Sequence, residues 1–233
     1  MKKYNDSKMI HSVFDKKILE TRAEKPSILS NVCCQDVNEI HTQVKQSPSS
    51  ELFVPPQPPE GGVKFSVAIL TVSDRAYNAE YSHGDLSGPA VKKSLSECVQ
   101  SLATKNSPIE CEINDIVIVP DEMNKIQSKL TDFSLKNKVD LILTTGGTGL
   151  SSRDVTPEAT AAVVDRECHA LMSFVASECS KQQPLATLSR GTAGILGATM
   201  ICNLPGNPKG VQEIMPILLP LVVHGIQDLQ ASK

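Results

Sequence analysis

The sequence has little that would suit a nucleic-acid-binding, membrane-spanning or secreted protein. Its 233 residues carry a net charge of −3, whereas nucleic-acid-binding surfaces normally need an excess of basic side chains. We see no apolar run of the length expected of a membrane span. The N-terminus has Asp6 and Asp15 among its lysines and no apolar core, unlike a secretory signal or a transit peptide. We therefore expect a cytoplasmic protein that binds neither nucleic acid nor membranes.

The cysteines and histidines suggest no structural metal site. Seven cysteines are an odd number, and none has Cys-x-x-Cys spacing, which favours free thiols in a reducing compartment over a disulfide framework or a zinc site. The five histidines are scattered along the chain. No Ser-His-Asp or Cys-His pairing suggests nucleophilic catalysis. The composition, 40% hydrophobic and 21% charged, is that of an ordinary globular protein.

The first 62 residues differ from the rest of the chain. They hold few apolar runs, and their eight basic and eight acidic side chains cancel. Residues 55–62 join paired prolines to two glycines, a composition typical of a linker that is stiff and then flexible. We predict a disordered tail over residues 1–62 and a folded domain over residues 63–233. A short helix near residues 10–22 and a partner-binding role of the tail stay open.

Strand-like and helix-like segments alternate through the predicted domain. Short apolar, β-rich runs predict strands over residues 65–72, 111–119, 139–143 and 200–204. Helical spacing of apolar residues predicts helices over residues 87–102, 122–133, 157–164, 171–179 and 211–229. Pro216 and Pro220 could kink the last of these helices. The alternation predicts an α/β fold with three layers, in which a mostly parallel sheet has helices on both faces.

A glycine-rich turn, residues 144–149, follows the third predicted strand. In an open α/β sheet, ligands bind at the carboxyl ends of the strands. Glycines at such a place let backbone N–H groups approach an anion closely. The charged pair Arg153-Asp154 comes next, before a Thr-Pro-Glu sequence that can begin a helix. These features predict a site for a phosphorylated ligand beside an aspartate.

Further polar clusters would meet the glycine turn at the same sheet edge. They are residues 71–75, 85–89, 120–122 and 203–210, with the weaker cluster 189–191. Each also has a simpler structural interpretation as a helix cap, a turn or a surface salt bridge. The glycine turn matches neither the GxxxxGK[ST] nor the GxGxxG phosphate motif. A ligand site is favoured because all the clusters would lie together. Asp121 and Asp154 would suit a hard cation such as Mg²⁺ held with phosphate oxygens, although acid–base roles stay open.

Taken in order, these blocks resemble the molybdopterin adenylyltransferase family, which includes bacterial MogA-type proteins and the matching domains of fusions such as gephyrin. The blocks are residues 70–74 (LTVSD), 85–89 (DLSGP), 119–122 (VPDE), 145–149 (TGGTG), 153–160 (RDVTPEAT), 188–190 (LSR) and 203–206 (NLPG). The resemblance implies transfer of AMP from Mg-ATP to the terminal phosphate of molybdopterin, with release of pyrophosphate. It also implies a homotrimer and a separate molybdate-inserting protein or domain that receives the product.

The resemblance implies residue roles as well. The two essential aspartates of the family fall on Asp121 and Asp154, which would also hold Mg²⁺. The pterin- and phosphate-contacting groups fall on Thr71, Ser73, Asp74, Asp85, Ser87, Gly88, Gly146, Gly147, Thr148, Ser189 and Arg190. Two other hypotheses stay open, namely a non-catalytic molybdopterin-binding or scaffold module and a nucleotide-phosphate hydrolase on the same fold.

Overall fold

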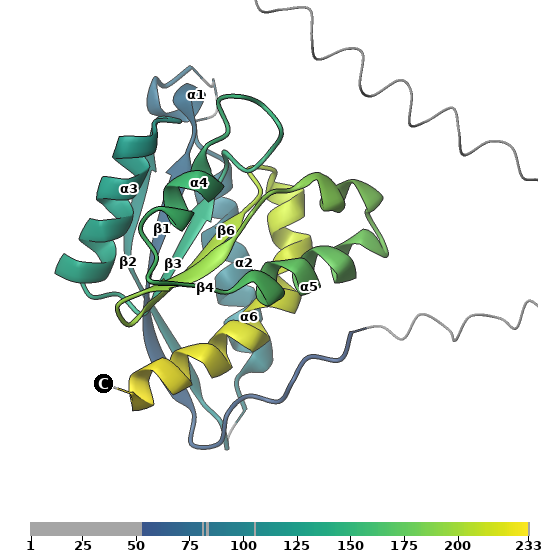
Figure 1. Ribbon diagram of the computed structural model, residues 1–233. Helices are drawn as coiled ribbons and strands as arrows, with labels where there is room; N and C mark the ends of the chain where they lie inside the picture. The colour runs from purple at the N-terminus through teal and green to yellow at the C-terminus, as the bar shows by residue number, and fades with distance from the viewer. Residues whose placement is uncertain (1–52, 81, 83, 105, 233) are drawn as a thin grey trace, which may run out of the picture. The chain divides into compact units, whose positions relative to one another are not determined.

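The computed structural model describes residues 53–80, 82, 84–104 and 106–232 (Figure 1). The chain divides into two units, Met1–Glu51 and Leu52–Lys233, and every described residue lies in the second. The predicted tail therefore lies outside the described residues as far as position 52. The helix considered near residues 10–22 lies outside them entirely.

A six-stranded sheet forms the middle layer of the second unit. Its strands are β1 (Val63–Val72), β2 (Ile109–Val119), β3 (Leu141–Thr145), β4 (Arg166–Glu167), β5 (Ala193–Leu196) and β6 (Thr199–Leu204). They lie in the order β2-β1-β3-β6-β5-β4. Strands β1, β2, β3 and β6 pair in parallel, whereas β5 is antiparallel to both β6 and β4. The predicted mostly parallel sheet is confirmed.

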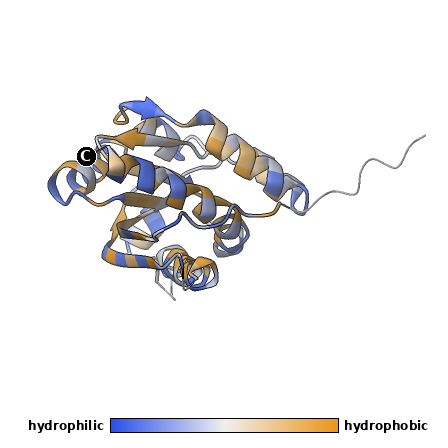
Figure 2. Cartoon of the chain, turned by 90° about the horizontal axis from the view of Figure 1, so that it is seen from below, coloured by the Kyte–Doolittle hydropathy of each residue, from blue (hydrophilic) through white to orange (hydrophobic). Residues whose placement is uncertain are grey.

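Helices cover both faces of this sheet. One face packs against α2 (Ser87–Leu102), α5 (His169–Ser180) and α6 (Pro208–Ala231), and the other against α3 (Met123–Thr131) and α4 (Thr156–Ala161) (Figure 1). Successive residues of a strand point to opposite faces. In β3, for example, Leu141 and Leu143 join the first core and Ile142 joins the second. Figure 2 shows hydrophobic and hydrophilic residues mixed along the helices, as this three-layer arrangement requires.

Several short elements lie outside the predicted segments. They are α1 (Asp74–Tyr77), β4, β5 and the 3₁₀ turn Pro184–Leu188. The predicted helix over residues 122–133 ends as α3 at Thr131 and continues into a π-helical turn, Asp132–Lys136. β5 and β6 form a tight hairpin around Gly197, which has a φ of +60°. Alternation of strands and helices cannot anticipate such a hairpin, because no helix separates its strands.

Helix α6 corrects one expectation from the sequence. It runs for 24 residues as one helix, although it contains Pro216 and Pro220. By length and composition alone it could cross a membrane, so the expectation that no stretch is long enough was wrong. Its buried residues, among them Val211, Leu218 and Val222, belong to the core between the sheet, α2 and α5. The apolar length of α6 therefore serves packing inside this unit.

The described part of the predicted tail, residues 53–62, contacts the domain. The Phe53 ring lies edge-on to Phe174, with ring centroids 5.4 Å apart. The backbone oxygen of Gln57 lies 2.7 Å from Nε2 of His224 in α6. Pro59 is buried. The domain boundary at residue 63 stays a prediction. These contacts favour the alternative that the folded domain already includes residues 53–62.

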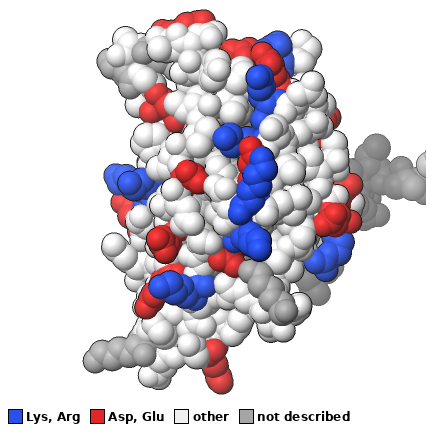
Figure 3. Space-filling model, turned by 90° about the vertical axis from the view of Figure 1, so that its left-hand side faces the viewer, with Lys and Arg blue, Asp and Glu red and all other residues white. Residues whose placement is uncertain are grey.

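Charges of both signs are interspersed on the surface around α3 and β2. Figure 3 shows this face, which is turned to the left in Figure 1, with Lys and Arg side chains next to Asp and Glu. One such pair joins Lys136 and Asp132 at 2.7 Å. The pairing is consistent with the near balance of charge in the sequence.

Candidate functional site

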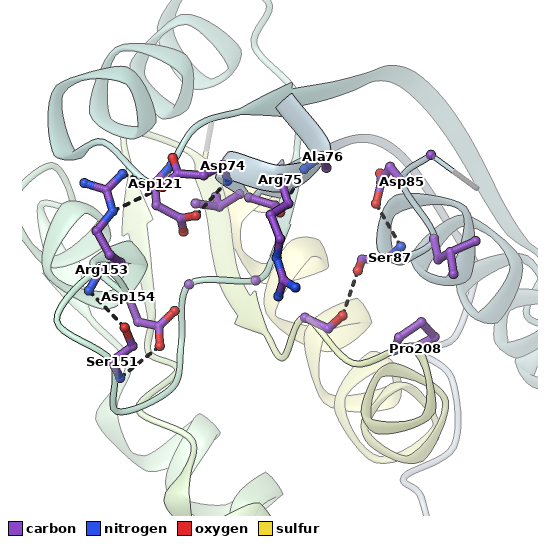
Figure 4. A pocket seen from close by; sticks show the side chains of 17 residues that line it. Asp74, Arg75, Ala76, Asp85, Ser87, Asp121, Ser151, Arg153, Asp154 and Pro208 are labelled. Carbon is purple, nitrogen blue, oxygen red and sulfur yellow. Dashed lines mark hydrogen bonds and ion pairs between the residues drawn. The ribbon is translucent and has the colours of Figure 1, made fainter. Parts of the chain in front are cut away.

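A cavity of about 620 Å³ opens at the carboxyl ends of β1, β3 and β6 (Figure 4). The chain passes from β1 to β2 on one side and places β3 on the other, so the strand order reverses between β1 and β3. Ligands of open α/β sheets bind at this kind of reversal. Eight of the predicted site residues line the cavity: Ser73, Asp74, Asp85, Ser87, Asp121, Gly146, Gly147 and Asp154.

Two positions of the glycine turn, Gly146 and Gly147, have no room for a side chain. A Cβ at Gly146 would lie 2.2 Å from the carbonyl oxygen of Val72, and Gly146 has a φ of +98°. A Cβ at Gly147 would lie 2.3 Å from Oγ1 of Thr156. That hydroxyl donates a hydrogen bond of 2.9 Å to the carbonyl oxygen of Gly146. The side chain at the start of α4 therefore holds the turn, and the bare turn backbone lines the cavity.

Asp74 and Asp121 hold each other through a reciprocal pair of hydrogen bonds. The backbone N–H of Asp74 donates to Oδ2 of Asp121 at 2.8 Å, and the backbone N–H of Asp121 donates to Oδ1 of Asp74 at 2.9 Å. These bonds join the residues that follow β1 and β2. They fix both carboxylates at the cavity through Oδ1 of Asp74 and Oδ2 of Asp121.

The charges around this pair shift the two pKa values in opposite directions. Arg153 donates from Nε and Nη2 to Oδ2 of Asp74, at 3.1 and 2.5 Å, and these hydrogen bonds hold the pKa of Asp74 below its ordinary value. Burial raises the pKa of Asp121, and the negative charges of Asp74 and Asp154 raise it further. A cation near Asp121 would therefore relieve repulsion between carboxylates.

The opposite wall is built by the start of α2. Asp85 accepts hydrogen bonds from the backbone N–H of Ser87, at 2.9 Å, and from the hydroxyl of Thr71, at 2.8 Å. The Ser87 hydroxyl donates to the carbonyl oxygen of Gly206, 2.7 Å away, and so joins α2 to the loop before α6. Asp85 thus accepts hydrogen bonds from the first backbone N–H groups of α2, although the N-cap position itself is occupied by Leu86. Thr71 and Gly88 lie behind this wall and support Asp85, outside the cavity lining.

Three other predicted residues also lie outside the cavity lining. Thr148 is buried, and its carbonyl oxygen accepts a hydrogen bond from the backbone N–H of Arg190. The Arg190 guanidinium donates to the carbonyl oxygens of Gly149 and Asp154 and pairs with Glu158. Arg190 therefore holds the glycine loop in place. Ser189 lines a second hollow of about 240 Å³ beside the start of α6.

Five further residues also line the cavity: Arg75, Ser151, Arg153, Gly206 and Pro208. All except Ser151 belong to clusters that the sequence placed at this sheet edge without giving them a role of their own. The salt bridge considered for Arg153 does form, but its partner is a cavity carboxylate. A signal was present, because each arginine directly follows or precedes an aspartate at a strand end: Asp74-Arg75 and Arg153-Asp154.

The carboxylates fit a cation that is shared with a phosphate ligand. Among the residues that the structure describes, no group of three or more His, Cys, Asp or Glu side chains is placed to hold a metal ion. Asp121 and Asp154 nevertheless line one cavity. Mg²⁺ is commonly bound by one or two carboxylates together with substrate phosphates. Two carboxylates in one cavity suit that mode, in which phosphate oxygens complete the set of ligands.

Comparison with known proteins identifies the family. A domain family described as "Probable molybdopterin binding domain" matches residues 68–224. This chain belongs to that family. The matched segment begins within β1 and ends within α6, so it contains every element that lines the cavity.

Relatives of this molybdopterin-binding domain include both short and long proteins. A molybdopterin adenylyltransferase of Helicobacter pylori (strain J99) is 36% identical, over 68% of this chain and 84% of that protein. The molybdopterin adenylyltransferase of Escherichia coli (strain K12) is 34% identical, over 69% and 78%. The Drosophila melanogaster protein cinnamon, a molybdenum cofactor synthesis protein, is 39% identical over 69% of this chain. The match spans only 25% of cinnamon.

Solved structures of similar proteins share the fold. MoaB from Thermus thermophilus, a molybdopterin biosynthesis enzyme, is 37% identical with a TM-score of 0.63. The similarity covers 72% of this chain and 97% of that one. A MogA structure is 30% identical with a TM-score of 0.55, over 70% and 99%. The α/β architecture of the molybdopterin-binding domain is thus shared almost end to end with these structures.

Proposed function

We propose that this chain is a molybdopterin adenylyltransferase that transfers AMP from ATP to the terminal phosphate of molybdopterin and releases pyrophosphate. One observation carries the proposal: Asp121 and Asp154, which follow different strands, line a single cavity with the Gly146-Gly147 turn. The relatives named molybdopterin adenylyltransferase, 34–36% identical over about two thirds of this chain, support it. Their activity places the chain in molybdenum cofactor biosynthesis.

The chemistry of the cavity suits this reaction. The attacking group is a phosphate monoester, whose second pKa near 6 makes it an anion at neutral pH. Such a nucleophile needs little help from a general base. It needs alignment with the α-phosphate of ATP and relief from the repulsion between two polyanions. The glycine turn allows phosphate oxygens to approach the backbone, and the strand ends fix the position of each surrounding group.

Asp121 and Asp154 would hold Mg²⁺ together with oxygens of the phosphates. When bound, the ion would supply neutralisation of phosphate charge and help to align the reacting groups. Because the described residues form no three-ligand group, the proposal includes phosphate oxygens as the remaining ligands. In this arrangement Asp74 keeps its hydrogen bonds with Arg153 and Asp121. The bond from its backbone N–H orients the Asp121 carboxylate.

Pyrophosphate release from ATP tests the proposal. It is measured with Mg²⁺, with and without molybdopterin, for the wild type and for Asp154→Asn. We expect release only with molybdopterin, and a loss of roughly a hundredfold or more in the variant, because metal positioning contributes several kcal/mol. Asp132→Asn is the control, because Asp132 is a surface carboxylate paired with Lys136.

Pyrophosphate release, together with a measurement of molybdopterin binding, separates the two other hypotheses. Release of pyrophosphate or phosphate from ATP without molybdopterin would favour the hydrolase. Tight molybdopterin binding with no release under any condition would favour the non-catalytic module. Either result would overturn the transfer reaction, since that reaction requires both substrates together.

We also propose that the protein forms a homotrimer in the cytoplasm and hands its product to a separate molybdate-inserting protein or domain. Gephyrin of Dictyostelium discoideum and cinnamon support the last point, because this chain matches only 22% and 25% of their lengths. The free cysteines of the described residues support a reducing compartment. Light scattering on the purified chain tests the oligomer, and a mass other than three chains would contradict it.

A further inference from the structure

The side chain of Arg75 projects into the cavity, and the reaction as proposed gives it no role. Arg75 belongs to α1, the short helix that follows β1, and it lines the cavity. Figure 4 shows its guanidinium between the wall with Asp121 and Asp154 and the wall with Ser87 and Pro208. It therefore lies in the space between the predicted cation site and the start of α2.

The backbone around Arg75 is fixed from several directions. The Ser73 hydroxyl accepts a hydrogen bond from the backbone N–H of Ala76, at 3.2 Å, and so caps α1. The backbone N–H of Asp74 is bound to Asp121, and the carbonyl oxygen of Arg75 accepts a hydrogen bond from Glu80, at 2.9 Å. The backbone from which the Arg75 side chain extends is thus held at the cavity, which limits the positions that its guanidinium can reach.

The other two arginines near the cavity serve the fold. Arg153 donates from Nε and Nη2 to one oxygen of Asp74. Arg190 donates to two carbonyl oxygens of the glycine loop and pairs with Glu158. Their guanidinium groups therefore hold Asp74 and the glycine loop. Figure 4 shows the guanidinium of Arg75 between the two walls of the cavity, which Arg75 also lines.

The negative charge that lines the cavity indicates a role for Arg75 in binding phosphate. Four carboxylates line the cavity, those of Asp74, Asp85, Asp121 and Asp154, against two arginines. A phosphoryl group that enters this space adds further negative charge. A planar guanidinium can donate two parallel hydrogen bonds to phosphate oxygens, and its positive charge persists at any physiological pH.

We propose that Arg75 is a catalytic residue that contacts the non-bridging oxygens of the phosphoryl group being transferred. The inference rests on the proposed adenylyl transfer. In that step an oxygen of the molybdopterin phosphate forms a bond to the α-phosphorus of ATP. The bond from this phosphorus to the bridging oxygen breaks, and its electron pair leaves with pyrophosphate. Arg75 donates hydrogen bonds to the α-phosphate throughout and transfers no proton.

An interaction that is strongest in the transition state affects kcat more than KM. For Arg75→Gln we expect kcat for pyrophosphate release to fall about a hundredfold or more, with the KM for ATP changed by roughly threefold at most. Arg75→Lys should restore part of kcat, because lysine keeps the charge but lacks the planar pair of donors.

The experiment compares steady-state pyrophosphate release by the wild type, Arg75→Gln, Arg75→Lys and the control Arg166→Gln. Arg166 is an exposed arginine on β4, outside the cavity lining. Calorimetric binding of ATP with Mg²⁺ gives a readout that does not depend on turnover, and we expect the Kd to be similar in all four proteins. Thermal unfolding checks that each variant is folded. If Arg75→Gln does not fold, the comparison is made with Arg75→Lys.

Three results would overturn the inference. In the first, an active wild type and an equally active Arg75→Gln variant would remove Arg75 from the reaction and leave the transfer intact. In the second, a raised KM and a weakened ATP Kd with unchanged kcat would make Arg75 a substrate-binding residue only. In the third, a wild type that releases no pyrophosphate with both substrates would overturn the proposed transfer and this inference together.

Discussion

The ion pair between Arg153 and Asp74 stabilises the fold in a way that depends on pH. Hydrogen bonds from Arg153 hold the pKa of Asp74 below its ordinary value of 3.8. A carboxyl group whose pKa is lowered by folding stabilises the folded state above its unfolded pKa. That stability is lost as the pH falls through the folded pKa. We therefore expect Arg153→Gln to be less stable than the wild type near neutral pH, and the difference to shrink well below pH 3.8.

Urea unfolding near neutral pH and well below pH 3.8 measures the difference in stability between Arg153→Gln and the wild type. Arg166→Gln is the control for loss of an exposed arginine. A deficit of the same size at both pH values would contradict the ion-pair account. It would mean that Arg153 stabilises the fold through packing, with no contribution from the charge of Asp74.

Two half-buried cysteines, Cys98 and Cys111, should react slowly at neutral pH. Burial raises the pKa of Cys98 to about 11 and that of Cys111 to about 12. The thiolate is the form that reacts with alkylating reagents. We expect iodoacetamide at neutral pH to label both thiols at least about a hundredfold more slowly in the folded protein than in urea, where the ordinary pKa near 8.5 returns. Mass spectrometry of the peptides measures the rates, and equal rates would show that both sites open readily.

At the level of single residues, the sequence predicts where a side chain lies along the chain better than where it points. Asp121 and Asp154 could be placed at the site because each follows a predicted strand. Arg190 was assigned to a ligand, yet its guanidinium donates to loop carbonyl oxygens. Arg75 follows Asp74 directly, and only the geometry of α1 shows that it projects into the cavity. Long side chains have many rotamers, and the tertiary structure selects among them.

The turn between β3 and α4 depends on close contact with β1. We expect Gly146→Ala to lower the free energy of unfolding by about 3 kcal/mol or more, because its Cβ would lie 2.2 Å from the carbonyl oxygen of Val72. Gly197→Ala is the matched control, since Gly197 also has positive φ but its Cβ would meet only Leu135, at 3.8 Å. That variant should cost about 1–2 kcal/mol.

Urea unfolding of the two glycine variants separates backbone strain from the clash. Equal losses of stability would show that the turn can move away from β1. The close approach would then not be needed for the fold. A loss confined to Gly146→Ala would show that contact with β1 decides the identity of the residue at this position.

At the level of elements, the sequence predicted the long helices and the central strands but missed features set by tertiary contacts. The third strand was expected over residues 139–143, yet β3 runs from Leu141 to Thr145. Thr144 and Thr145 extend it because their backbones pair with both β1 and β6. Their buried hydroxyls find partners in Asn203 and the carbonyl oxygen of Pro205. Strand β5 contains Ala193 and Gly194, small residues with little strand preference, and it forms because it pairs with β6.

For the whole molecule, alternation and the ordered blocks predicted the architecture, whereas the domain boundary that composition places at residue 63 stays a prediction. Prolines and glycines dominate the stretch from residue 55, and this composition predicts a linker. Composition cannot show whether such a segment packs on a surface. In the structure, Phe53 contacts Phe174, and Gln57 contacts His224. These partners lie more than a hundred residues away in the chain, beyond the reach of local pattern.

Two truncated chains decide which boundary describes the folded unit. The chain 53–233 keeps the contacts of Phe53 and Gln57, and the chain 63–233 loses both. An aromatic pair contributes about 0.5–1.5 kcal/mol beyond its buried area, and a hydrogen bond contributes about 1 kcal/mol. We therefore expect the shorter chain to be less stable by about 1–2 kcal/mol in urea unfolding. Phe53→Ala in the chain 53–233 should reproduce part of this loss, whereas equal stability of the two truncated chains would put the boundary back at residue 63.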